Sequence, residues 1–109
     1  MAGKLEAGRQ IVSQMESANL DPKRPRLVTQ LFLGDDKRLV ALKQRLDQVG
    51  WPAAADGPGR LLASATTPTD RNWVAMNTAA MCAAADAFDV EWDGWDVDVA
   101  ADHVQQKPQ

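Results

Sequence analysis

The densest group of side chains that could do chemistry lies near the C-terminal end of the sequence. It comprises Asp86, Asp89, Glu91, Asp93, Asp96, Asp98 and Asp102, and no Lys or Arg occurs from residue 72 to residue 106. Carboxylate oxygens bind hard cations, but alternate residues of a strand lie about 6.6 Å apart, which is too far for all of them to surround one ion. The seven also lack the spacing of a calcium loop. A solvated acidic face is therefore favoured, and no metal site is predicted.

Other catalytic groups are sparse. His103 is the single histidine, and the single cysteine, Cys82, lies among alanines in a helical pattern, which favours a small core residue over a nucleophile. The glycine cluster at residues 57–59 lacks the lysine and the following helix of a phosphate-binding loop. We therefore expect no catalytic residues, no cofactor and no enzymatic activity.

Composition and charge narrow the class of protein. The 109 residues are 45% hydrophobic and 25% charged, which is typical of one globular domain. The net charge is -3, and residues 72–109 carry one basic against seven acidic side chains, so a direct nucleic-acid partner is not expected. The basic cluster of Lys23, Arg24 and Arg26 is better explained as a solvated strand entry. The sequence shows neither a long apolar run nor a signal core, which predicts a cytoplasmic protein without a membrane partner.

Hydrophobic periodicity predicts the elements that position the acidic residues. Residues 5–18 indicate an amphipathic helix, because Ile11, Val12 and Met15 recur at helical spacing. Residues 27–33 indicate a strand whose two faces are both apolar, which favours a central, largely covered strand.

Two further helices and a hairpin follow. Asp35 or Asp36 caps a helix that ends at Gly50, and residues 51–55 and 60–67 form a hairpin around the turn at 56–59. Thr69 or Asp70 then caps the longest helix. The expected apolar stripe of the first of these helices is Leu39, Leu42, Leu46 and Val49, and that of the second is Trp73, Met76, Asn77, Ala80, Met81, Ala84 and Ala87.

The last strand, residues 89–99, contains a change of phase. Val90 and Trp92 lie on one face of a regular strand, whereas Trp95, Val97 and Val99 lie on the other. A one-residue bulge at Asp93-Gly94 would bring all five to the core side and would turn Glu91, Asp93, Asp96 and Asp98 outward. We therefore predict that bulge.

The order of elements predicts the fold class. Strands that are separated by helices require right-handed crossovers, which leave both helices on the same face of the sheet. We expect an α+β protein, namely a ferredoxin-like β-α-β-β-α-β sandwich with an antiparallel sheet and an extra N-terminal helix. A single domain spans residues 5–99, and residues 100–109 form a flexible tail.

Residues 88–95, Phe-Asp-Val-Glu-Trp-Asp-Gly-Trp, resemble the closing strand of the RraB family, whose members regulate ribonuclease E activity. The order of elements from Ile11 to Val99 is compatible with that family. The resemblance implies a ferredoxin-like fold and a non-catalytic role, in which the protein binds a ribonuclease E-type endonuclease and lowers its activity. Family members often extend into a strongly acidic tail, whereas the tail here is short.

These observations lead to a partner-binding hypothesis. We expect the acidic outer face of the closing strand to bind a basic protein surface, with Trp95 as either an interface anchor or a core residue. A small-ligand-sensing module and a metal-dependent hydrolase are the alternative functions, and a homodimer is left open. The predicted partner-binding residues are Glu91, Asp93, Trp95, Asp96 and Asp98.

Overall fold

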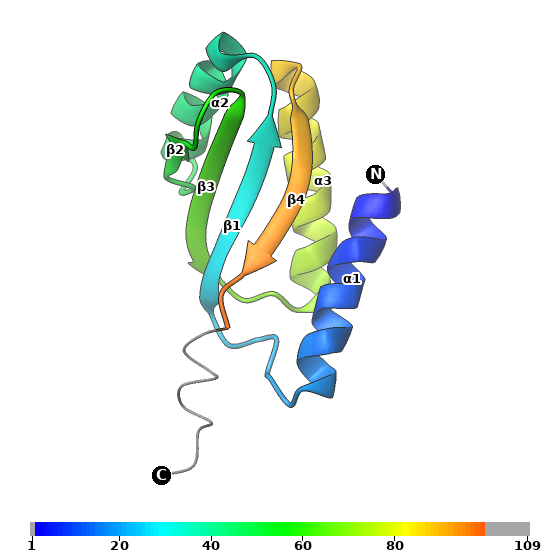
Figure 1. Cartoon of the computed structure of the whole chain (residues 1–109). Coiled ribbons are helices and arrows are strands. Elements are labelled where there is room, and N and C mark those ends of the chain that lie inside the picture. The colour runs from blue at the N-terminus through cyan, green and yellow to red at the C-terminus, as the bar shows by residue number, and fades with distance from the viewer. Residues whose placement is uncertain (1, 100–109) are drawn as a thin grey trace.

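The computed structural model describes residues 2–99, which form three helices and a four-stranded antiparallel sheet (Figure 1). The sheet order is β2-β3-β1-β4, so the first strand is central and the last strand forms an edge. The α+β class is therefore confirmed. The tail at 100–109, with Asp102 and His103, lies outside the described residues. The elements are α1 (Ala2–Ser17), β1 (Arg26–Leu33), α2 (Asp36–Gln48), β2 (Ala53–Ala55), β3 (Arg60–Thr67), α3 (Arg71–Phe88) and β4 (Glu91–Val97).

Helices α2 and α3 both lie on one face of the sheet, behind it in the view of Figure 1. The core fills the space between these helices and the sheet, and Phe32, Leu42 and Leu61 are its largest fully buried apolar side chains. None of the helices within residues 2–99 lies over the opposite face (Figure 1). None of the helices within residues 2–99 combines the length and the apolar character needed to span a membrane.

Helix α1 packs against α3 beside the β4 edge of the sheet (Figure 1). Val12 and Met15 are buried in this contact, as their spacing predicted. Gly8 allows the close approach, because a Cβ atom at this position would lie 2.7 Å from Val74 Cγ1. The helix ends before Asn19, which has a left-handed φ of 60°.

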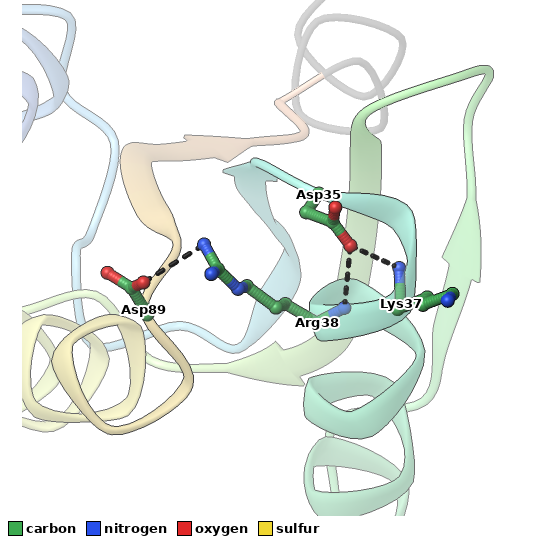
Figure 2. A network of polar contacts seen from close by, with 4 residues as sticks. All are labelled: Asp35, Lys37, Arg38 and Asp89. Carbon is green, nitrogen blue, oxygen red and sulfur yellow. Dashed lines mark hydrogen bonds and ion pairs between the residues drawn. The ribbon is translucent and has the colours of Figure 1, made fainter.

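Aspartates cap the N-terminal ends of α2 and α3. Asp35 precedes α2, and its Oδ1 accepts hydrogen bonds from the backbone N–H groups of Lys37 (2.8 Å) and Arg38 (3.4 Å), which Figure 2 shows. Arg38 also forms an ion pair of 2.9 Å with Asp89, the residue that follows α3 (Figure 2). This ion pair joins the start of α2 to the end of α3. Asp70 caps α3 through the N–H of Trp73 (2.9 Å).

The predicted apolar stripe of α3 was partly wrong. Met76 leaves 71% of its surface exposed, and Ala80 and Ala87 are exposed as well. An alanine-rich helix carries few large side chains that could mark its inner face, so the periodicity there was ambiguous. The prediction that Val49 belongs to the apolar stripe of α2 was also wrong, because Val49 lies at the C-cap and is 51% exposed. The buried residues of α3 are Val74, Asn77, Thr78, Met81 and Ala85.

The bulge in β4 is confirmed. Leu31 pairs with Gly94 and Phe32 pairs with Trp92, so Asp93 is the extra residue between them. As a result Trp92 and Trp95 share the helix-covered face of the sheet. Gly94 has a φ of +111°, which few residues other than glycine adopt without strain.

Strand β1 is central, as predicted, but the three described helices cover only one of its faces. Val28, Gln30 and Phe32 have no exposed surface on the covered face. On the other face Leu27 is 45% exposed, so the expectation of a largely covered strand was wrong there. The apolar residues of this face do not belong to the core.

A chain of hydrogen bonds crosses the covered face. The indole Nε1 of Trp92 donates to Gln30 Oε1 (2.9 Å), and Gln30 Nε2 donates to Asn77 Oδ1 (2.7 Å). All three side chains are buried. Because buried polar groups are costly when unpaired, this chain fixes the position of α3 relative to β1 and β4.

Candidate functional site

The structure separates the five predicted site residues. Glu91 pairs with Leu33 and Asp96 pairs with Thr29, so both carboxylates lie on the helix-free face of the sheet. Trp95 pairs with Gln30 and lies on the covered face. The carboxylates and the indole ring therefore do not form one surface.

Trp95 packs between the helices and the sheet. Its ring lies against Trp73 of α3, with centroids 5.0 Å apart and planes at 84°, an edge-to-face contact. A Cβ atom at Gly8 would come within 3.3 Å of its Nε1, so α1 covers the ring as well. The indole N–H is buried and has no hydrogen-bond partner among residues 2–99. Trp95 thus contributes to the packing of α1, α3 and β4.

The remaining carboxylates of the acidic segment point in different directions. Asp93, at the bulge, lies 3.8 Å from the ammonium of Lys4 on α1. Asp89 pairs with Arg38, and Asp98 follows β4, where its N–H donates to Leu27 O (2.9 Å). Glu91 and Asp96 form no ion pair with any residue from 2 to 99. These two are the unpaired carboxylates of the helix-free face.

We define the open face as the helix-free side of β1 and β3 with Glu91, Gly94 and Asp96 of β4. Its centre is apolar, and most of its side chains are half-buried. Thr29 Oγ1 and Ser64 Oγ form a hydrogen bond of 3.0 Å across β1 and β3. The residues of β1 and β3 on this face are Leu27, Thr29, Leu31, Leu33, Arg60, Leu62, Ser64 and Thr66, and Arg60 forms an ion pair of 3.2 Å with Asp56.

A hollow of about 340 Å³ lies on the open face above the bulge. Thr29, Leu31 and Leu62 form its apolar side, and residues 93–96 of β4 form its acidic side. The sequence reasoning found the acidic side but missed the residues of β1 and β3. The alternation of apolar residues on both faces of residues 27–33 was the available signal, and it was interpreted as burial.

A larger hollow, of about 650 Å³, lies between α1 and the start of α3. Three of its polar side chains already have partners within the fold: Arg71 pairs with Glu16 (2.7 Å), and Asp70 caps α3. Asp21 accepts a hydrogen bond from the N–H of Lys23 (3.0 Å). The charged groups around this hollow, with the exception of the Lys23 ammonium, therefore have partners within the fold.

The open face offers apolar contact area, hydroxyl groups and two carboxylates. No group of three or more His, Cys, Asp or Glu side chains in this part of the chain lies close enough to hold a metal ion. Cys82 is half-buried beside the core. An apolar centre next to unpaired carboxylates favours a partner that brings both apolar surface and positive charge.

The carboxylate of Asp47, which lies away from the open face, has an altered pKa. The Lys43 ammonium hydrogen-bonds to Asp47 Oδ2 (2.6 Å) and the N–H of Ala53 to its Oδ1 (2.8 Å), and these bonds hold the pKa of Asp47 below its ordinary value of 3.8. Asp47 therefore connects the end of α2 to β2 and serves the fold.

No protein-family model and no curated protein matches this sequence.

Proposed function

We propose that the chain is a non-catalytic, protein-binding regulator that inhibits a ribonuclease E-type endoribonuclease in the cytoplasm. The observation that carries this proposal is the open face, where an apolar surface without a covering helix lies beside the unpaired carboxylates Glu91 and Asp96. The resemblance of residues 88–95 to the RraB closing strand supports the choice of target. The strand order β2-β3-β1-β4 supports a ferredoxin-like arrangement with an added N-terminal helix.

Inhibition would follow from competition for basic surface. Enzymes that cleave RNA hold its phosphates with Lys and Arg, and an acidic protein surface can occupy those side chains and exclude the RNA. The leucines of the open face supply apolar contact area, and the two carboxylates direct the approach of a basic segment. The test must therefore separate charge on the open face from charge elsewhere.

We would measure binding of the full chain to the purified endonuclease, and the rate of RNA cleavage, at about 50 mM and about 500 mM salt. Glu91→Gln/Asp96→Asn removes the unpaired carboxylates of the open face. Glu6→Gln/Asp86→Asn is the matched control, because it removes the same charge from exposed positions on α1 and α3. At low salt the open-face variant should associate about tenfold more slowly, and the control should behave as the native chain.

Two results would contradict the proposal. Absence of binding between the native chain and the endonuclease would remove the target. Equal effects of the two double variants would show that net charge, and not the open face, determines the association. High salt should reduce the difference between native and variant chains, because exposed charges are screened over about 8 Å at physiological ionic strength and over less at higher salt.

A further inference from the structure

The hollow on the open face exists because β4 lacks a side chain at one point. Gly94 lies directly opposite Leu31, and a Cβ atom at Gly94 would meet no other atom within 4 Å. The positive φ of this residue disfavours any side chain there. The bulge thus leaves an opening beside Leu31 and Leu62, bordered by the acidic residues of β4. Its volume is at the low end of the ~300–1,000 Å³ of small-ligand sites, which suits one long side chain.

The border of the hollow consists of hydrogen-bond acceptors on one side and hydrocarbon on the other. Asp96, which has no ion pair within residues 2–99, lies opposite Thr29 and offers both carboxylate oxygens. Thr29 also lines the hollow; its hydroxyl shares a hydrogen bond with Ser64 Oγ, and its oxygen retains acceptor capacity. Among residues 2–99, no Lys or Arg lines the hollow. Its occupant must therefore be a donor with positive charge and an apolar stem.

We propose that the hollow above Gly94 binds one arginine side chain of the partner, with its stem on Leu31 and Leu62 and its guanidinium on the Asp96 carboxylate. The statement that this arginine belongs to a partner protein rests on the proposed function. Arginine fits better than lysine for two reasons. Its guanidinium is weakly hydrated and tolerates an apolar wall, and its planar set of donors matches a carboxylate with two bonds.

The test uses a probe that contains no endonuclease. We would titrate the full, isotope-labelled chain with N-acetyl-arginine-N-methylamide and follow the backbone amide signals. The probe should shift the signals of Leu31, Leu62, Gly94 and Asp96 with saturation and with a dissociation constant on the order of millimolar. The citrulline analogue has the same shape without the charge and should cause no saturable shift. The lysine analogue should bind at least threefold more weakly.

Three variants locate the binding. Asp96→Asn should weaken binding of the arginine probe at least fivefold, and Leu62→Ser should weaken it by removing part of the apolar wall. Asp86→Asn removes one exposed carboxylate on α3 and should leave the affinity unchanged. A dispersed amide spectrum of each variant confirms that it is folded, so a loss of binding can be assigned to the hollow.

Several results would overturn the inference. Equal shifts with citrulline would exclude charge recognition, and equal or tighter binding of the lysine analogue would exclude the assignment to arginine. Shifts spread evenly over Glu6, Asp86 and Asp96 would indicate only a diffuse ion atmosphere. The two hypotheses fail separately: the arginine probe can fail while the endonuclease binds, and it can bind the hollow while the endonuclease does not.

Discussion

On the helix-covered face of β1, Val28, Gln30 and Phe32 have no exposed surface, whereas Leu27 on the open face leaves 45% of its surface exposed. The two faces are nevertheless similar in apolar content. Apolar alternation along a strand therefore does not by itself reveal which faces are core. The covered face owes its character to the helices packed on it, and the open face calls for a different explanation, which the proposed partner supplies.

The largest expected contrast between the two faces is in stability. Phe32→Ala creates a cavity in the core and should lower the free energy of unfolding by about 3–5 kcal/mol. Leu31→Ala removes a half-buried side chain from the open face and should cost about 1 kcal/mol. Urea unfolding of both variants measures the difference. Similar losses at the two positions would mean that the open face is packed as tightly as the core.

A second contrast concerns polar groups on neighbouring residues of β1. Gln30→Met keeps the length of the side chain but leaves Trp92 Nε1 and Asn77 Oδ1 buried without their partner, which should cost about 2–4 kcal/mol. The matched control is Thr29→Val, which breaks the bond to Ser64 on the open face, where water can replace it, and should cost less than about 0.5 kcal/mol.

The role of the chain of hydrogen bonds can be checked further with a triple variant. Replacing Gln30, Trp92 and Asn77 together by Met, Phe and Leu removes all the paired polar groups and should recover part of the stability lost in Gln30→Met. No recovery would show that packing, and not the hydrogen bonds, explains the loss at Gln30. Chemical unfolding monitored by the remaining tryptophans gives both values.

The same comparison shows how much of the molecule could be predicted from the sequence. The element order and the bulge could be predicted, because turn residues, caps and the phase change at Gly94 are local signals. The buried position of Gln30 could not, because its partner Asn77 lies 47 residues away and a single strand does not indicate such a pairing.

The candidate site was only half predictable for a related reason. The carboxylates of β4 stand out as a run in the sequence, but whether each is free depends on distant residues such as Lys4 and Arg38. The open face is assembled from β1, β3 and β4, and its hollow appears only once Gly94 is paired with Leu31. The sequence left Trp95 open between an interface anchor and a core residue, because the helices that cover its ring are likewise distant in the chain.

The smallest expected effect distinguishes a carboxylate that serves the fold from one that does not. The lowered pKa of Asp47 means that the folded chain binds its proton less readily than the unfolded chain. Its stabilising contribution is therefore complete at pH values above the ordinary 3.8 and is lost as the pH falls below that value. Asp47→Asn should lower stability slightly at pH 7 and should reduce the loss of stability on acidification. Asp96→Asn, which removes a carboxylate without an ion pair, should leave stability at pH 7 within about 0.5 kcal/mol of the native chain. The measurement is the urea midpoint of the native chain and of both variants from pH 7 to about pH 3. The same pH dependence of stability in the two variants would contradict the distinction between Asp47 and Asp96.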